Sequence, residues 1–295
     1  MLTLLGAGQG QNGKEKRLIF SVKTDNAGTS TTNQFTIPTI GTDYLYNIET
    51  SDGQSITGRT GNTTITFSNA GTYDVFISGN FSRFNFANTG DRLKLTNLKN
   101  FGIYALGSNN QSDSFFGCSN MVISATDTGN FENVTIFSET FRNCSSIIKF
   151  PLINMISCDN IQGMFRGCSS LTPFPLLNTS NVSFFANAFS FLSSLTSFPL
   201  LNFNNSTNFS LAFRFSPIVN FPANAFDNSL ASNYSGAFDS TNLSQQSIDN
   251  ILVSIDTNGT INGVFNQSGG GNTPSATGLT AKANLISKGW TVTTN

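Results

Sequence analysis

The chain has 295 residues, of which only 11% are charged, with 15 Lys and Arg against 16 Asp and Glu and a formal net charge of −1. Binding to nucleic-acid phosphates needs clustered Lys and Arg, so this composition argues against a nucleic-acid partner. His is absent from the sequence, which removes the commonest general base and the nucleophiles that His activates, and so argues against an enzyme.

The cysteines also give no sign of a metal or redox site. Their positions include no CxxC pair, and we interpret them as small buried apolar residues: Cys118, Cys144, Cys158 and Cys168. No apolar run reaches the roughly 18 residues of a transmembrane helix. Residues 1–11 lack the basic and apolar regions of a signal peptide, so we expect a chain made in a host cytoplasm without export.

The N-terminal part is predicted to be all β. We interpret residues 1–16 as an anchoring extension and residues 17–80 as a β-sandwich, with strands over 17–23, 34–37, 63–67 and 72–78. The segment AGTYDVFISG (70–79) resembles the closing strand of PKD-like immunoglobulin-type domains. Asp25, Asp52 and Asp74 are candidate calcium ligands, but their positions favour roles in turns and on a solvated strand face.

Residues 81–114 are predicted to cover one end of the region that follows, and that region, residues 115–243, is repetitive. Three segments align without gaps: FRNCSSIIKFPLIN from Phe141, FRGCSSLTPFPLLN from Phe165 and FSFLSSLTSFPLLN from Phe189. Further copies begin at Phe115, Phe213 and Phe238. A period of about 24 residues is typical of leucine-rich repeats, whose coils stack into a solenoid.

The repeat assigns a role to each recurring position. The leading Phe residues are predicted to form an internal aromatic ladder, and three Cys residues share a second buried position with Leu192. A short strand is predicted after each proline, over 152–153, 176–177 and 200–201. The Asn residues that follow in register are expected to satisfy turn backbone groups as an asparagine ladder: Asn154, Asn178 and Asn202.

The pattern F-x-x-C-S-S-L-x-x-F-P resembles the BspA-like class of leucine-rich repeats, found in bacterial surface proteins and in structural proteins of tailed phages. The resemblance covers residues 115 to about 240. It implies a solenoid scaffold. Because such scaffolds serve many partners, it says less about function than about architecture.

Residues 244–295 are predicted to form a small α/β cap. Ser244 caps a helix over 245–254, and a strand over 263–266, a helix over 280–288 and a strand over 290–293 follow. This order resembles a C-terminal cap of phage structural proteins that carry such repeats. The Gly-rich turn at 269–271 lacks the spacing of a phosphate loop, so we expect no nucleotide cofactor.

One charged position recurs in the repeats. Arg142, Arg166 and Arg214 directly follow a leading Phe, with Ser190 interrupting, and they are the binding residues that we predict. Three solvated arginines without a ligand are the alternative. The acidic residues of the region do not recur in phase, so we predict no catalytic, cofactor-binding or metal-binding residue among Asp127, Glu132, Glu139 and Asp159.

Together these features predict a mainly β fold with an N-terminal β-sandwich, a central leucine-rich-repeat-like solenoid and a small α/β C-terminal cap. The resemblance implies a non-enzymatic virion protein of a tailed phage, a tail fibre or spike-type adhesin that contacts the host surface. Expected partners are other virion proteins and a host-surface glycan or protein, without nucleic acid or membrane insertion, and a homo-oligomer stays open. The alternatives are a capsid or tail decoration protein, a bacterial surface adhesin and a polysaccharide-degrading enzyme.

Overall fold

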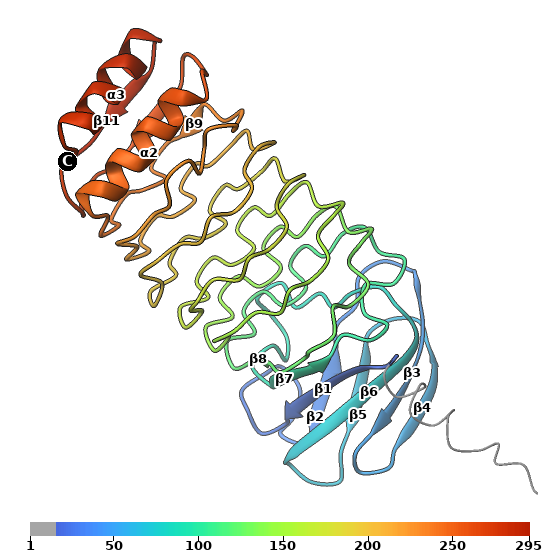
Figure 1. The fold of residues 1–295 in the computed structure, drawn as a ribbon. Coiled ribbons are helices and arrows are strands. Elements are labelled where there is room, and N and C mark those ends of the chain that lie inside the picture. Colours follow the sequence, from blue (N-terminus) through green and yellow to red (C-terminus); the bar gives the residue numbers. More distant parts are fainter. Residues whose placement is uncertain (1–15) are drawn as a thin grey trace, which may run out of the picture.

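A computed structural model describes residues 16–295, so the expected anchor over residues 1–16 lies, apart from Lys16, outside the described residues. The fold is mainly β, with open sheets and two long helices near the C-terminus. The strands of the N-terminal part gather at one end of an elongated molecule, the helices α2 (Gln245–Thr257) and α3 (Ala276–Ser287) lie at the other end with three short strands, and the repeat region fills the space between them (Figure 1).

The N-terminal strands form a six-stranded and a two-stranded sheet. The larger sheet has the order β4-β3-β6-β1-β7-β8, and β2 pairs with β5 in the smaller one. The strands are β1 (Leu18–Lys23), β2 (Gln34–Ile37), β3 (Tyr44–Thr50), β4 (Ser55–Arg59), β5 (Thr63–Thr66), β6 (Thr72–Phe81), β7 (Leu95–Asn100) and β8 (Val122–Ile123). The four strands predicted in this part of the chain, β1, β2, β5 and β6, are confirmed.

β3 and β4 were not predicted from the sequence. β3 alternates between buried and exposed residues, with Tyr44, Tyr46 and Ile48 pointing inward. Leu45 is 62% exposed on the opposite face. Because an exposed Leu stands between two inward Tyr residues, the sequence reads as a continuous apolar run, and the alternation of the strand is hidden.

The larger sheet does not stop at residue 80. β7, from the segment expected to be a separate transition, pairs antiparallel with β1, and β8, from the first repeat, pairs parallel with β7. Phe84 and Tyr104 pack on Phe115, with ring centroids 5.4 and 5.5 Å apart. Residues 81–114 therefore cover the first coil and also belong to the sheet.

Successive repeats are joined by main-chain hydrogen bonds. Glu139, Phe141 and Asn143 donate their N–H groups to carbonyls of the next repeat, at 2.8, 3.0 and 2.7 Å. The N–H groups between them, such as those of Arg142 and Cys144, bond to carbonyls three residues earlier in their own repeat. Every second N–H thus links two coils while the backbone itself runs as consecutive turns, which satisfies its donors without an extended strand.

The strands predicted after each proline are wrong. Residues 152–153, 176–177 and 200–201 are irregular, and the parallel bridges between repeats lie elsewhere, along Asn110, Ile136, Asn160, Phe184, Asn208 and Asn233. The Ile153 N–H bonds to Pro151 O at 3.1 Å, so the chain turns there. Asn154, which follows, closes a further turn with Ile156.

The turn role expected of those asparagines is confirmed, but the expected ladder between them is not seen within residues 16–295. The side-chain oxygens of Asn154, Asn178 and Asn202 accept the N–H two residues later, at 3.1, 3.2 and 3.0 Å. A side chain that bonds its own backbone in this way closes a turn. The bonds lie within single coils, so these amides shape each coil rather than join coils together.

Aromatic rings stack through the interior of the repeats, as predicted. The centroids of Phe115 and Phe141 are 5.2 Å apart with nearly parallel rings, and Phe213 lies 5.3 and 5.1 Å from Phe189 and Phe238. A second column, Phe174, Phe198 and Phe221, runs beside the first. Stacked and edge-on ring contacts add to the free energy of burial.

The cysteines lie in this interior, buried and free. The Cys144 and Cys168 thiols lie 3.1 Å from the carbonyls of Phe115 and Phe141 in the preceding coil. Burial raises the pKa of Cys158 and of Cys168 to about 12, so the thiolates are scarce near neutral pH.

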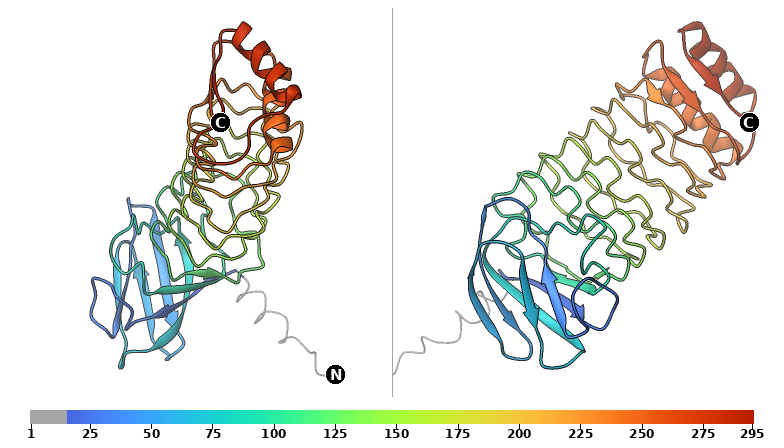
Figure 2. Two further views of the ribbon diagram at one scale, coloured as in Figure 1. Left: turned by 90° about the vertical axis from the view of Figure 1, so that its left-hand side faces the viewer. Right: turned by 180° about the vertical axis from the view of Figure 1, so that it is seen from behind.

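The C-terminal elements continue the coil-to-coil bridges. The strands β9 (Asn233–Tyr234), β10 (Val264–Asn266) and β11 (Thr291–Thr293) are parallel in the order β11-β10-β9, and Asn208 bridges to Asn233. The helices α2 (Gln245–Thr257) and α3 (Ala276–Ser287) connect them. In Figures 1 and 2 these helices lie side by side at the end of the stack.

Both predicted helices are present. Ser244 caps α2 as expected, whereas α3 begins at Ala276, four residues earlier than predicted, because Ser275 caps it. No helix within residues 16–295 is long and apolar enough to cross a membrane.

Candidate binding surface

The three predicted arginines occupy equivalent positions on the coils. Each follows a buried leading Phe, and main-chain hydrogen bonds hold the repeats in register at these positions, as from Asn143 N–H to Arg166 O (2.7 Å) and from Phe191 N–H to Arg214 O (2.9 Å). Ser190 occupies the interrupted position and is buried. The register of the repeat therefore brings residues about 24 apart in the sequence to one side of the molecule.

Each guanidinium group lies over an aromatic ring. The Cζ atom of Arg142 is 4.6 Å from the centroid of Phe116, that of Arg166 is 5.5 Å from Phe191, and that of Arg214 is 4.6 Å from Phe215. Such contacts stabilise a cation over the negative face of a ring. We call these six residues the Arg–Phe strip.

The two phenylalanines at the distal end of the strip touch each other in the open. The rings of Phe191 and Phe215 have centroids 4.9 Å apart, and the residues are 38% and 41% exposed. Most Phe residues of the repeats are instead buried in the core. An exposed aromatic pair beside cationic groups is the kind of surface that takes part in binding.

The backbone at these phenylalanines has a conformation that disfavours them. The residue two places after the leading Phe has positive φ in every coil, and Gly117, Asn143 and Gly167 hold this position with φ of 84°, 58° and 74°. Phe191 and Phe215 adopt φ of 61° and 58° there. Gly and Asn tolerate this region, whereas a bulky side chain is strained in it, and strained residues cluster at functional sites.

Charge on the strip is only partly balanced. Arg142 pairs with Glu139 at 2.9 Å, whereas the guanidinium groups of Arg166 and Arg214 have no ion pair or hydrogen bond among residues 16–295. The buried Nε atom of Arg214 also lacks a partner. Burial and the nearby charges of Arg142 and Arg214 lower the pKa of Arg166, against an opposing effect of Glu139. Arg nonetheless keeps its charge in proteins.

Glu139 is shifted in the other direction. Burial raises the pKa of its carboxyl group above the usual range, although Arg142 and Arg166 act to lower it. Its side chain packs against Gly163 of the next coil. Glu139 thus neutralises Arg142, and the net positive charge of the strip is concentrated at Arg166 and Arg214.

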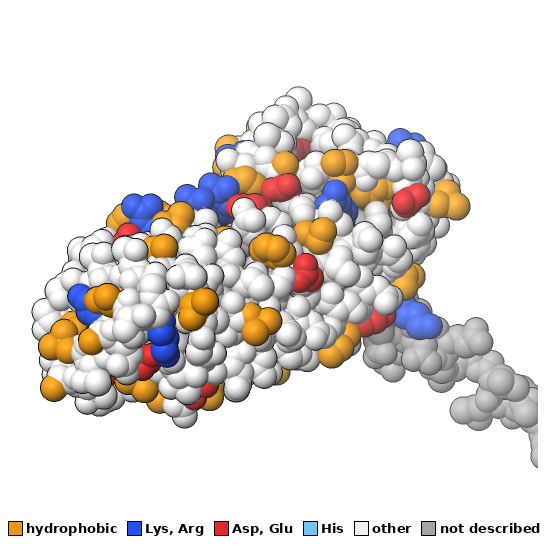
Figure 3. Space-filling model, turned by 90° about the horizontal axis from the view of Figure 1, so that it is seen from above, with side chains coloured by type: hydrophobic (Ala, Val, Ile, Leu, Met, Phe, Trp, Pro, Cys, Tyr) orange, Lys and Arg blue, Asp and Glu red, His pale blue; other side chains and the backbone are white. Residues whose placement is uncertain are grey.

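A hollow of about 350 Å³ lies within the strip. Arg142, Arg166 and Phe191 line it, together with the small polar residues Asn143, Ser169 and Ser193. It combines two cations, an aromatic ring and several hydrogen-bonding groups. On the face of the molecule drawn in Figure 3, uncharged side chains that are not hydrophobic, together with the backbone, cover most of the surface, and Lys and Arg form a few small groups.

Sequence reasoning located the arginines and missed the aromatic residues. No separate role was predicted for Phe116, Phe191 or Phe215, because only the leading Phe of each repeat was assigned one. The available signal was the position two after the leading Phe, which reads Gly, Asn and Gly in three copies and then Phe in the next two. That change of residue type marks where the strip differs from the rest of the repeat.

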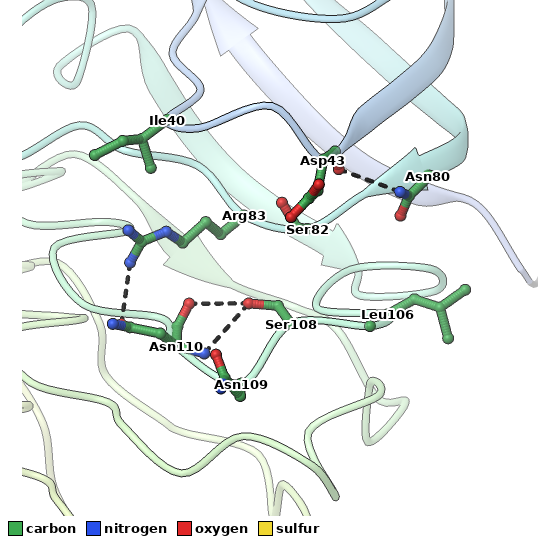
Figure 4. A pocket seen from close by; sticks show the side chains of 10 residues that line it. Ile40, Asp43, Asn80, Ser82, Arg83, Leu106, Ser108, Asn109 and Asn110 are labelled. Carbon is green, nitrogen blue, oxygen red and sulfur yellow. Dashed lines mark hydrogen bonds between the residues drawn. The ribbon is translucent and has the colours of Figure 1, made fainter.

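A second hollow, of about 420 Å³, lies where the β region meets the first coils. Figure 4 shows Ile40, Asp43 and Asn80 on one side and Asn109 and Asn110 on the other, with Arg83 reaching between them. Arg83 donates to Asn110 Oδ1 at 3.1 Å and to Ser112 O at 3.0 Å. Its guanidinium is therefore engaged in joining the two parts, and we interpret this hollow as a structural junction.

The acidic residues considered from the sequence lie apart from one another in local contacts. Asp127 accepts the N–H groups of Phe101 and Gly102 at 2.9 and 2.8 Å, and Asp159 bonds to Ser183 of the next coil. Glu139 pairs with Arg142 as described, and Glu132 is exposed. The described part of the chain brings no two of these carboxylates together as a catalytic pair.

The three Asp residues considered as calcium ligands are also separate. Asp25 pairs with Lys23 at 2.6 Å, and Asp52 bonds to Thr50 and Gln54 in a turn. Burial alone would raise the pKa of Asp74, but hydrogen bonds from Lys99 and Ser21 lower it overall. Over residues 16–295 no group of three or more acidic or Cys side chains is placed to hold a metal ion.

Comparisons of the chain with protein-family models, with curated proteins and with solved structures found no match.

Proposed function

We propose that this protein is a non-enzymatic recognition protein of a tailed-phage virion, a tail fibre or spike-type adhesin of the BspA-like class that contacts the host surface. The observation that carries the binding role is the Arg–Phe strip. Arg166 and Arg214 are cations without an ion pair among the described residues, and they stand beside an exposed and strained pair of phenylalanines.

The proposal includes a leucine-rich-repeat-like solenoid as scaffold. The regular main-chain bonds between repeats and the stacked Phe rings support this architecture. An open end of such a stack would expose its core. The β region covers one end and α2 and α3 the other, which supports a rigid rod that holds a side-chain pattern in fixed geometry.

The phage setting is supported by the repeat pattern F-x-x-C-S-S-L-x-x-F-P and by the helix and strand order after it, both of which resemble phage structural proteins. In that setting the partners are other virion proteins and a glycan or protein of the host surface. A decoration protein without a receptor role and a bacterial surface adhesin are the alternatives. The two differ in location, since the first would lie on the capsid or tail and the second on the bacterial envelope.

Immunogold electron microscopy tests the placement. Antibody raised against the recombinant chain is applied to purified virions from a lysate of the strain that carries the gene. Label on tail tips or fibres is the expected result. Label over the head would favour the decoration protein, and label on bacterial envelopes with bare virions would overturn the phage assignment.

A further inference from the structure

We propose that the Arg–Phe strip binds an acidic polysaccharide. Sugar rings lie on the faces of Phe191 and Phe215, and ring carboxylates pair with the guanidinium groups of Arg166 and Arg214. This inference rests on the proposed function and specifies the ligand class of the same surface.

The unbalanced charge points to an anion. Glu139 forms its ion pair with Arg142, and Arg166 and Arg214 have no ion pair among the described residues. Their planar groups present paired N–H donors in a fork that matches a carboxylate. Each group is already held over a ring at 5.5 or 4.6 Å, so an arriving anion meets a side chain whose orientation is set.

The exposed rings point to a ligand with flat, weakly polar faces. Phe191 and Phe215 form a tilted pair with 34° between the ring planes, and together they offer a surface two rings long. The C–H face of a pyranose is apolar while its rim carries hydroxyl groups. Asn143, Ser169 and Ser193 beside Phe191 supply donors and acceptors for such hydroxyls.

An extended peptide fits this surface less well because the main-chain N–H groups near the two exposed rings are already hydrogen-bonded. Around Phe191 and Phe215 the N–H groups donate to carbonyls of the next coil, at 2.9 and 3.0 Å. An extended peptide that adds to a sheet edge needs free main-chain groups. The free hydrogen-bond donors here are therefore side chains, and they suit a ligand recognised through rings, hydroxyls and carboxylates.

A nucleic acid fits less well because the positive charge is sparse. The whole chain carries a formal net charge of −1, and the strip contains two unbalanced cations. Binding along a phosphate backbone neutralises many charges and needs a continuous run of Lys and Arg. Two cations that stand two coils apart, with Ser190 on the coil between them, instead match charges spaced along a polymer of mostly neutral groups.

The test measures binding of the full chain to polygalacturonate, to its fully methyl-esterified form and to dextran by isothermal titration calorimetry. The esterified polymer keeps the sugar rings and loses the carboxylates. We expect binding to polygalacturonate, at least about tenfold weaker binding to the ester, and none to dextran, since a tenfold change corresponds to roughly one good contact. Equal binding to the acid and to its ester would overturn the role of the arginines.

Matched variants place the binding on the strip. R166Q and R214Q, and separately F191N and F215N, are each expected to weaken binding by about fivefold or more, as for residues at the centre of an interface. K149Q removes an exposed Lys away from the strip, and F184N removes a Phe that is 41% exposed but lies outside it. Both controls are expected to bind as the parent does. A loss in K149Q equal to that in R166Q would show non-specific charge attraction and overturn the site.

Two further probes separate the ligand classes. Oligo-dT and poly-glutamate carry anions without pyranose faces, and tighter binding to either than to polygalacturonate would overturn the polysaccharide assignment. Failure to bind every uronate polymer, with gold label still present on tail tips, would refute this inference and leave the proposed function standing. Binding to polygalacturonate with label on bacterial envelopes alone would refute the phage placement and keep the ligand class.

Discussion

At the scale of single residues, the exposed aromatic pair of the Arg–Phe strip stands at one recurring backbone position of the repeat. The left-handed conformation two residues after each leading Phe costs an ordinary L-residue about 1–2 kcal/mol, whereas Gly and Asn adopt it routinely. Phe191 and Phe215 accept this cost with φ of 61° and 58°. Their mutual contact returns about 0.5–1.5 kcal/mol. Because this contact does not fully offset the backbone strain at the two residues, we infer that the rings serve binding and not stability.

The strain predicts how F191N behaves. Asn already stands at the equivalent position 143 with φ of 58°, so F191N is expected to keep the unfolding free energy of the parent or to raise it by up to about 1 kcal/mol. Guanidinium unfolding followed by circular dichroism measures this. F184A is the control, because Phe184 is similarly exposed but lacks positive φ, and no gain is expected there. A loss of more than about 1 kcal/mol in F191N would mean that the ring serves stability.

At the scale of the structural element, each coil is held by two different ladders. Alternate N–H groups join it to the next coil, while leading Phe rings stack in its interior. Phe165, in the middle of the stack, is fully buried and contacts Phe141, Phe150 and Phe174 at centroid distances of 6.2, 4.9 and 5.2 Å. Because the coil has no extended strand, this packing is a large part of its stability.

Truncation of that ring is expected to be severe. F165A should lower the free energy of unfolding by about 3–5 kcal/mol, since it leaves a cavity that stacked neighbours cannot close. Chemical denaturation of the full chain gives the value. F184A, at a ring that is 41% exposed, should stay within roughly 0.5 kcal/mol of the parent. Equal effects of the two substitutions would contradict the internal ladder as the main source of coil stability.

At the scale of the whole molecule, a buried polar cluster holds two distant segments of the β region together. Asp91 and Lys94 are each 1% exposed and both contact the Ser30 hydroxyl, at 2.6 and 2.8 Å. Asp91 also accepts the N–H groups of Ser30 and Thr36, and Lys94 donates to the Gln34 carbonyl at 2.9 Å. The cluster ties the long loop between β1 and β2 to the segment just before β7.

The pH dependence of stability should report on this cluster. Burial alone would raise the pKa of Asp91, but hydrogen bonds from Ser30 and Thr36 and the charge of Lys94 lower it overall. A carboxyl whose pKa is lowered by folding stabilises the fold above its unfolded pKa of about 3.9, and this contribution is lost as the pH falls through the folded value.

D91N is therefore expected to be less stable than the parent at pH 7 by about 2–4 kcal/mol, because an amide donor replaces an acceptor among donors. The difference should begin to shrink below roughly pH 4, where the carboxyl of the unfolded chain becomes protonated, and should shrink further as the pH falls through the lowered pKa of the folded parent. Urea unfolding at pH 7, 5 and 3.5 measures it, with the exposed Asp43 substituted in D43N as control. A difference that is constant across this range would show that the charge of Asp91 does not contribute.

Much of the fold was predictable because it depends on local patterns. The alternation in β1 and β6, the Ser244 cap and the Phe repeat are short-range signals that survive in the structure. The strands predicted at 152–153, 176–177 and 200–201 failed because apolar residues after a proline indicate burial of one side chain and not hydrogen bonding. In that segment Ile153 is buried while Leu152 is 60% exposed, and the chain turns.

The sequence by itself determined the period of the coils, their buried positions and the register of Arg142, Arg166 and Arg214, since these follow from residues repeated at constant spacing. Only the tertiary structure decided that β7 and β8 extend the N-terminal sheet, that Glu139 neutralises one arginine, and that Phe191 and Phe215 meet in the open. Pairing, exposure and backbone strain depend on neighbours in adjacent coils, and no local pattern of residues records those neighbours.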